Sequence, residues 1–160
     1  MRDWTVGGAL IRHKDGLVLV ANRRRDGSID WTPPGGVIDE GESVLAGLER
    51  EVLEETGLVV DRWIGRQYEV VVEAPGLGWR MRVEAWEVGA FSGEIVLADP
   101  DRIVEEVRFA PREEGMALLQ ASAPWLHVPI GLWMEGAAVS SYHFVVQGAE
   151  RSSAVIERLR

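Results

Sequence analysis

The chain has 160 residues, enough for one domain with a buried core, and its 46% hydrophobic and 27% charged residues are typical of a globular protein. The formal net charge of −9 disfavours binding to a nucleic-acid backbone, and the lack of cysteine excludes disulfides, thiolate metal sites and a cysteine nucleophile. We expect no signal peptide and no membrane-spanning stretch, which indicates a soluble, cytoplasmic protein without a membrane partner.

The first part of the chain alternates strand and turn signals. Val6–Arg12 and the continuous apolar run Leu17–Ala21 are predicted strands. The prolines and glycines of Trp31–Gly36 then exclude a helix, because they remove amide donors and favour unusual dihedral angles. Ser43 as an N-cap and Gly57 as a C-terminal stop predict a helix of about three to four turns between them.

The middle of the chain predicts a long hairpin followed by a strand and a helix. Trp63–Val72 and Arg80–Val88 are predicted strands, joined by a turn at Pro75–Gly78. Val104–Phe109 is another predicted strand, and a helix is expected from Pro111 to about Gln120, with acidic residues in its first turn. Strands interleaved with helices indicate a mixed α/β (α+β) domain.

The last 40 residues carry weaker signals. Trp125–Glu135 predicts a helix interrupted near Pro129, and Ser141–Gln147 predicts a strand. Ser152–Arg160 is expected to form a short terminal helix. Since no linker divides the chain, we expect one domain over residues 1–160, with 121–160 as a C-terminal extension of it.

Three glutamates share one side of the helix predicted after Ser43. At about 100° per residue, Glu51, Glu54 and Glu55 fall within an arc of roughly 100°, at the margin of the apolar stripe. One interpretation is a solvated acidic face, in which like charges three and four residues apart repel one another. The other is a Mg²⁺ site, because this ion favours several carboxylate oxygens together with substrate phosphates. The spacing alone leaves both open.

A longer pattern surrounds these glutamates. Gly36 is followed by five residues and Glu42, then by seven residues and the run R-E-V-L-E-E-T-G-L that ends at Leu58. This resembles the signature of the Nudix hydrolases, which has glycine, glutamate and R-E-U-x-E-E-x-G-U at this spacing, U being a bulky apolar residue. Nine positions agree over the 23 residues 36–58. The preceding Trp31-x-x-Pro34-Gly35-Gly36 also looks like the lead-in of this family.

The resemblance implies a Nudix fold, with a mixed β-sheet sandwiched between helices, and a role for each signature residue. Mg²⁺ or Mn²⁺ would be held by Gly36, through its carbonyl, and by Glu51, Glu54 and Glu55. Glu51 would be a further ligand or the base that activates water. Arg50 would orient a neighbouring glutamate, and Glu42 would support the loop or reach the metal through water. Gly57 would end the helix.

Other candidates lie outside the signature. In some Nudix enzymes the base or an extra ligand comes from another loop, and Glu105 and Glu106 are the candidates here; an exposed acidic turn is the alternative. Arg23 opens the one tight cluster of arginines and could bind a substrate phosphate, or be a solvated surface residue. Trp31, like Trp79 and Trp86, could stack on a base or pack in the core.

The resemblance therefore implies a pyrophosphohydrolase acting on a small nucleotide, either a nucleoside triphosphate or a nucleotide sugar such as ADP-ribose. Pro75 lies 17 residues beyond Leu58, close to a proline that marks ADP-ribose enzymes in the family. A module that binds and senses a nucleotide without cleaving it is the alternative, and an isomerase of isoprenoid diphosphates is a third. Since family members are often dimers, a homodimer is also an expectation.

Overall fold

The structure, a computed structural model, describes residues 1–96, 103–148 and 155–158. In chain order its elements are β1 (Arg2–Leu10), β2 (Arg12–His13), β3 (Gly16–Arg23), β4 (Ile29–Thr32), β5 (Gly35–Val37), α1 (Val44–Thr56), β6 (Val59–Ala74), a 3₁₀ turn (Pro75–Leu77), β7 (Trp79–Ser92), β8 (Val104–Ala110), α2 (Arg112–Leu119), α3 (Pro124–Met134), β9 (Ser141–Gln147) and β10 (Val155–Arg158). No helix within these ranges is long and apolar enough to cross a membrane.

The strands form two sheets. The larger has the order β10-β9-β6-β7-β1-β5, in which β1 pairs with β7 and β6 with β9 in parallel, while the other pairs are antiparallel. The smaller sheet centres on β3, which pairs antiparallel with β2, β4 and β8. The sheet is therefore mixed, as predicted.

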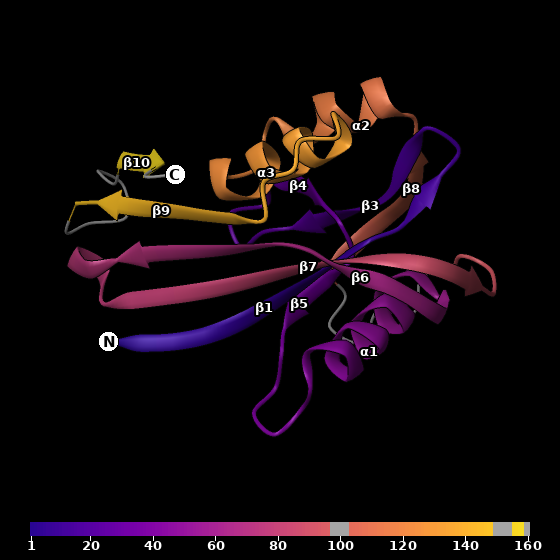
Figure 1. Cartoon of the computed structure of the whole chain (residues 1–160), viewed down its shortest axis with the longest axis horizontal. Helices are drawn as coiled ribbons and strands as arrows, with labels where there is room; N and C mark the ends of the chain where they lie inside the picture. Colours follow the sequence, from indigo (N-terminus) through magenta and orange to yellow (C-terminus); the bar gives the residue numbers. More distant parts are fainter. Residues whose placement is uncertain (97–102, 149–154, 159–160) are drawn as a thin grey trace.

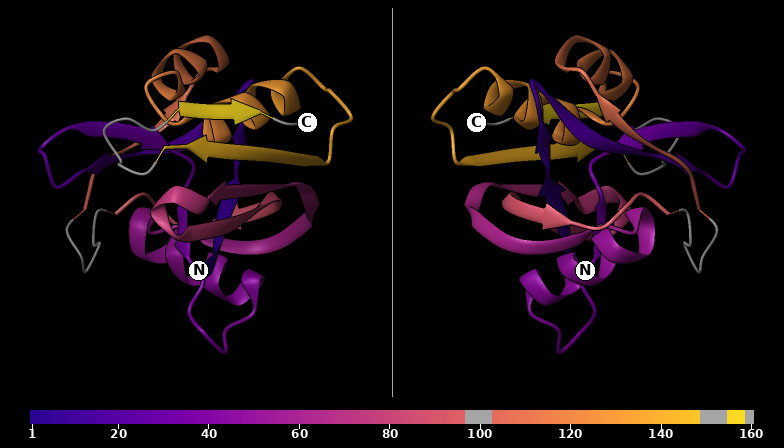
Figure 2. Two further views of the ribbon diagram at one scale, coloured as in Figure 1. Left: turned by 90° about the vertical axis from the view of Figure 1, so that its left-hand side faces the viewer. Right: turned by 90° about the vertical axis from the view of Figure 1, so that its right-hand side faces the viewer.

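Helices cover both faces of this arrangement. Figure 1 shows α1 below the larger sheet, with α2 and α3 above it and β9 beside α3. The two side views in Figure 2 keep α1 and the pair α2–α3 at opposite ends of the molecule. The predicted fold class, a mixed sheet between helices, is confirmed.

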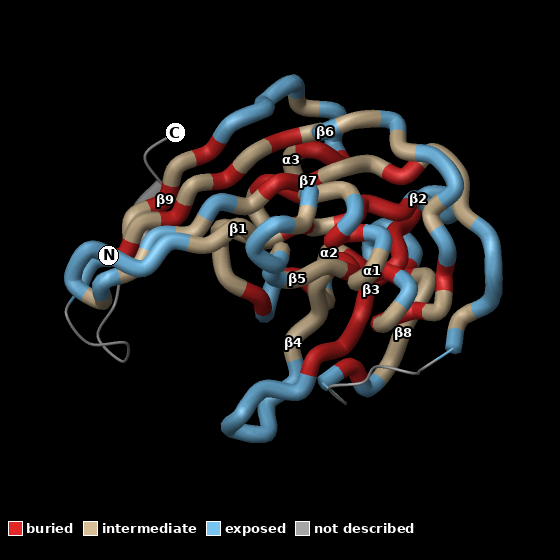
Figure 3. The backbone as a smooth tube through the Cα atoms, turned by 90° about the horizontal axis from the view of Figure 1, so that it is seen from below, coloured by how far each residue is buried: buried red, intermediate tan, exposed pale blue. Residues whose placement is uncertain are grey.

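The long β6–β7 hairpin separates two environments. Along the end of β6 the side chains alternate, with Tyr68, Val70 and Val72 buried toward α3 and the intervening positions only partly buried. The alternation is visible as red and tan segments along β6 and β9 in Figure 3. This period of two is the signature of a strand whose two faces meet different surroundings.

A separate apolar cluster lies under α1, where Leu48 and Val52 pack against Ile11, Val18 and Val88. The helix approaches β1 so closely that a Cβ placed on Gly7 would lie 2.7 Å from Cγ of Leu48. Burying Leu48 and Val52 completely contributes roughly 1.5–3 kcal/mol each. This packing holds the acidic side of α1 at the edge of the sheet.

Two predictions for the C-terminal part were wrong. The helix expected to break near Pro129 is continuous, because its buried residues pack on the sheet and outweigh the one hydrogen bond that Pro129 cannot donate to the carbonyl of Trp125. The terminal helix expected over Ser152–Arg160 is contradicted by β10, whose pairing with β9 decides the conformation of this short segment. The rest of that range lies outside the described residues.

Candidate active site at the signature loop and helix

The signature helix begins and ends where the sequence predicts. The Ser43 hydroxyl accepts a hydrogen bond from the Ala46 amide at 3.1 Å, satisfying a donor of the first turn. Gly57 adopts a left-handed conformation with φ of 81°, and its amide donates to the Leu53 carbonyl. A Cβ on Gly57 would also lie 2.7 Å from the Glu94 carbonyl oxygen, so glycine is required there on two grounds.

Two of the three signature glutamates meet the glycines of β5. The Gly35 amide donates a hydrogen bond of 2.8 Å to Oε1 of Glu55, whose side chain is buried. A Cβ on Gly36 would lie 3.0 Å from the carboxyl carbon of Glu51, so the lack of a side chain lets this carboxylate approach the loop. Residues 15 to 20 positions apart are thereby brought together beside the backbone of Gly36.

Arg50 joins the remaining carboxylates. Its Nε and Nη2 donate to the two oxygens of Glu42 at 2.9 and 3.0 Å, a bidentate pair. Its Nη1 donates to Glu51 at 3.1 Å and to Glu54 at 3.4 Å, and Asp39 lies 3.5 Å from Nη2. One guanidinium thus offsets part of the repulsion among four carboxylates.

These contacts shift two pKa values. Hydrogen bonds from the Arg50 side chain, and secondarily from the Asp39 amide, lower the pKa of Glu42 to about 2. The pKa of Arg50 is raised, mainly by its hydrogen bonds to Glu42. Both groups therefore stay charged near neutral pH, and Glu42 ties the loop to α1.

The donor atoms suit a hard divalent cation in kind, because oxygen donors are what Mg²⁺ and Mn²⁺ prefer. Glu55 reaches the Gly35 amide, Glu51 lies close to Gly36, and Glu54 on the same helix contacts Arg50. Within the described ranges, no three acidic or histidine side chains yet converge as a closed ligand cluster. Instead, Arg50 engages an oxygen of Glu51 and one of Glu54.

A cavity of about 320 Å³ opens on the other side of the same glycines. Its walls combine β5, β1, β7 and β6 of the larger sheet, the β3–β4 region and α3, and its size is that of a small-ligand pocket. The residues that line it are Val6, Gly7, Gly8, Leu10, Asn22, Arg24, Thr32, Pro33, Gly35, Gly36, Val37, Tyr68, Met81, Val83, Ala85, Trp125, Leu126 and Ile130. Gly35 and Gly36 thus separate this cavity from the acidic edge of α1.

The two substrate-binding candidates Arg23 and Trp31 are not among the residues that line the cavity, which is lined instead by Arg24 and Trp125. Arg23 forms an ion pair with Glu105. Trp31 lies beneath the guanidinium of Arg108, 4.7 Å from ring centroid to Cζ. The substrate contacts proposed for Arg23 and Trp31 remain predictions.

Sequence reasoning missed Asn22 and Tyr68 as cavity residues. Seven consecutive residues of β3, from Gly16 to Asn22, are buried, so hydrophobic alternation cannot reveal which of its side chains face the cavity. Tyr68 belongs to a strand recognised from sequence, but only the approach of α3 makes it a cavity wall. No signal in the linear pattern could have identified either residue.

The two carboxylates considered as an extra base are each held by an arginine. Glu105 pairs with Arg23, and Glu106 accepts hydrogen bonds from Arg108, with Nε at 2.8 Å. Both lie on β8, which is paired with β3 in the smaller sheet. Their role in catalysis stays a prediction.

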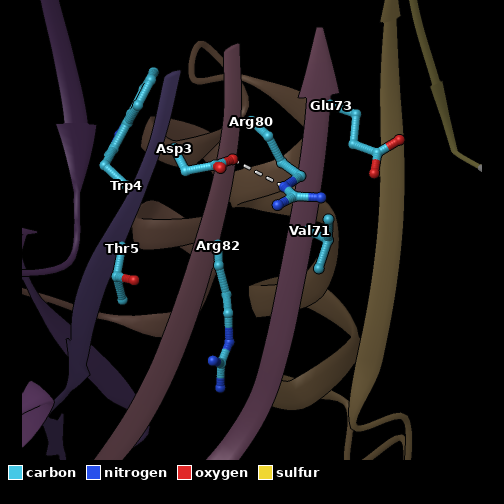
Figure 4. A pocket seen from close by; sticks show the side chains of 7 residues that line it. All are labelled: Asp3, Trp4, Thr5, Val71, Glu73, Arg80 and Arg82. Atoms are coloured by element: carbon cyan, nitrogen blue, oxygen red, sulfur yellow. Dashed lines mark hydrogen bonds and ion pairs between the residues drawn. The ribbon is translucent and has the colours of Figure 1, made fainter. Parts of the chain in front are cut away.

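A second hollow, of about 410 Å³, lies on the open face of the larger sheet (Figure 4). Arg80 donates to Asp3 at 2.9 Å, and Arg82 lies 3.3 Å from Glu69 and 3.2 Å from Glu84. Since acids on neighbouring strands already offset these arginines, the hollow is poorly suited to a substrate diphosphate.

The chain is similar to known proteins in sequence. A family model described as NUDIX domain matches residues 1–130. An RNA pyrophosphohydrolase of Caulobacter vibrioides is 32% identical over 98 residues, covering 54% of this chain and 57% of that protein. A MutT-like protein of Streptomyces ambofaciens is 40% identical over 57 residues, covering 36% and 35%. The chain thus spans little more than half the length of the Caulobacter relative.

Solved structures share the fold. The MutT protein from Bacillus halodurans superimposes with a TM-score of 0.68 at 20% identity, covering 96% of this chain and 97% of that one. A MutT NUDIX hydrolase from Burkholderia pseudomallei gives a TM-score of 0.60 at 24% identity, covering 76% and 100%. The family indicated by the nine signature positions is confirmed, and this chain belongs to the NUDIX domain family.

Proposed function

We propose that the protein hydrolyses a pyrophosphate bond in a small nucleotide-like substrate, with Mg²⁺ or Mn²⁺ as cofactor. One observation carries the proposal: the Gly35–Gly36 segment of β5 has the signature carboxylates on one side and a cavity of about 320 Å³ on the other. A substrate lying across this segment would have its diphosphate beside the glutamates and its organic part in the cavity.

The cation would be held by the Gly36 carbonyl and by Glu51, Glu54 and Glu55. When bound, it would neutralise the charge of the diphosphate and lower the pKa of the attacking water. This is the chemistry that a pyrophosphate requires, because its negative oxygens otherwise repel a nucleophile. NUDIX hydrolases generally use divalent metals, which supports the assignment.

The chain's own residues divide the remaining work. Glu51, at the Gly36 backbone, is the proposed base that accepts the proton of the water. Arg50 acts as a positioning residue. It donates two hydrogen bonds to Glu42, and its Nη1 donates to Glu51 and Glu54, which orients these two carboxylates. Glu42 in turn accepts a hydrogen bond from the Asp39 backbone amide, which fixes the loop that would face the substrate.

Substrate class follows from the cavity and from the relatives. Its largely apolar wall with a few polar groups suits a nucleoside, so we propose a nucleoside triphosphate or an ADP-ribose-like nucleotide sugar. The similarity to an RNA pyrophosphohydrolase favours the 5′ end of RNA as a second candidate. The net charge of −9 would disfavour contacts to more than the first nucleotides of such a strand.

A substrate panel tests the proposal. Purified protein with Mg²⁺ or Mn²⁺ is incubated with nucleoside di- and triphosphates, ADP-ribose, dinucleotides and 5′-triphosphorylated RNA, and released phosphate and pyrophosphate are measured. We expect turnover of at least one of these, abolished by EDTA and restored by added metal. Failure to cleave any of them with either ion would overturn the proposal.

A comparison of the wild type with Glu51→Gln distinguishes an enzyme from a module that only senses a nucleotide. A module that only senses a nucleotide would bind it tightly in calorimetry and would bind equally well after Glu51→Gln, without turnover in either form. Hydrolysis by the wild type and its loss in Glu51→Gln would support the enzyme instead.

A further inference from the structure

We propose that Asn22 and Tyr68 determine substrate specificity by binding a nucleobase in the cavity. The side-chain Oδ1 of Asn22 accepts a hydrogen bond from an N–H group of the base. The inference rests on the proposed function and goes beyond it, because it states which part of the nucleotide occupies the cavity. It also predicts which chemical group on that part is recognised.

The side-chain amide of Asn22 has a defined orientation. Its Nδ2 donates to the Thr32 hydroxyl at 2.9 Å and faces the Val20 carbonyl oxygen at 3.5 Å. A backbone carbonyl can only accept, so the nitrogen rather than the oxygen must face Val20. Asn22 is 6% exposed and lines the cavity, and its Oδ1 accepts no hydrogen bond from any residue in the described ranges.

Tyr68, on β6, lines the same cavity and supplies a second polar group. It is 4% exposed, its ring packs edge-on against Tyr142, and no residue that the structure describes is hydrogen-bonded to its hydroxyl. Burial raises the pKa of Tyr68, so the hydroxyl keeps its proton and can donate. Neither polar atom is fully enclosed, and both residues line the cavity, so a ligand in the cavity can supply the hydrogen-bond partners that the protein does not.

The rest of the cavity is lined largely by apolar side chains of the sheet and of α3, including Leu10, Met81, Val83, Trp125 and Ile130. Such walls favour the flat faces of a heterocycle, and the indole of Trp125 offers an aromatic partner. A phosphate would leave these walls without contacts and would place negative charge near an acceptor oxygen. An N–H donor with an adjacent ring nitrogen, as in adenine or cytosine, complements both Asn22 and Tyr68.

Matched nucleotide pairs test this inference. The wild type is assayed with Mg²⁺ on ATP against purine riboside triphosphate, and on CTP against pyrimidin-2-one riboside triphosphate, since the second member of each pair lacks the amino group. We expect kcat/KM to fall about 10-fold or more for the analogue of the preferred base, because an unmatched buried acceptor penalises it.

Variants assign the effect to the two residues. Asn22→Leu should reduce the preference within the pair to less than about 3-fold, mainly through KM for the natural nucleotide, because it removes the acceptor oxygen. Tyr68→Phe should raise KM for both members equally, because both retain ring nitrogens. Circular dichroism and thermal unfolding check that each variant folds, and Tyr68→Phe provides a test that leaves the Asn22–Thr32 bond intact.

The outcomes separate this inference from the proposed function. Equal kcat/KM for both members of each pair in the wild type overturns the role of Asn22, whatever the rate. If no nucleotide is cleaved, the proposed function fails, and calorimetric binding of the same pairs still tests the inference. Tighter binding of the amino-bearing member supports it, and equal or undetectable binding of both overturns it.

Discussion

The two sides of the Gly35–Gly36 segment of β5 are built in opposite ways. The acidic side comes from one loop and one helix, and its contacts join residues within the 23 positions from Gly36 to Leu58, apart from the neighbouring Gly35. The cavity side takes residues from six strands and α3, separated by up to 124 positions between Val6 and Ile130. The carboxylates proposed for catalysis are thus positioned by residues close in sequence, whereas the cavity proposed to select the substrate depends on how elements distant in sequence pack together.

The largest effect is expected on the acidic side. Glu51→Gln should lower kcat by about 10²–10⁴-fold, because a proton acceptor is lost, while the fold is retained. Glu49→Gln on the same helix is the matched control, since Glu49 is exposed and accepts a hydrogen bond from the Trp63 indole instead. Single-turnover rates measure both, and equal losses in the two variants would contradict a local role for Glu51.

The attachment of this side to the sheet can be broken separately. Leu48→Ala should destabilise the protein by about 2–5 kcal/mol, since Leu48 is fully buried under α1. Urea unfolding followed by circular dichroism measures the change, with the exposed Leu53→Ala as control. If both variants show the same small decrease in the free energy of unfolding, the packing of Leu48 would not be what holds the carboxylates at the sheet edge.

The cavity side can be blocked without touching the acidic side. A Cβ on Gly8 would meet no described atom within 4 Å, and Gly8 lines the cavity. Gly8→Leu should therefore fill the cavity and raise KM at least about 10-fold while leaving the folded state intact. Gly8→Ala, which adds one methyl, should have a much smaller effect. A Gly8→Leu variant with wild-type KM would show that substrates do not enter this cavity.

The smallest effect concerns the Glu42–Arg50 pair. The pKa of Glu42 is about 2 in the folded protein and close to 4.5 ordinarily, so the unfolded chain binds the proton more readily. The stabilisation is complete above about pH 4.5 and is lost as the pH falls toward 2. Glu42→Gln should weaken the decrease in the free energy of unfolding between pH 4.5 and 2, measured by denaturant titrations at several pH values. If the variant shows the same pH dependence as the wild type, the lowered pKa of Glu42 would be contradicted.

The linear pattern predicted much of the fold where one cause dominates. The helix between Ser43 and Gly57 is confirmed because a side-chain cap and a left-handed glycine act within single turns. The β6–β7 hairpin was recognised, although both strands extend beyond the predicted ends. The prediction of a terminal helix was wrong because Val155–Arg158 is too short for its local helix preference to compete with pairing to β9.

By itself the sequence determined the family, the signature helix and the set of carboxylates, because these depend on spacings within one loop and one helix, where backbone geometry converts position directly into proximity. Only the tertiary structure decided that Arg24 rather than Arg23 lines the cavity, and that Trp125, Asn22 and Tyr68 share it. Those placements arise from packing α3 against two sheets, and contacts between elements far apart in sequence leave no periodic trace in the chain.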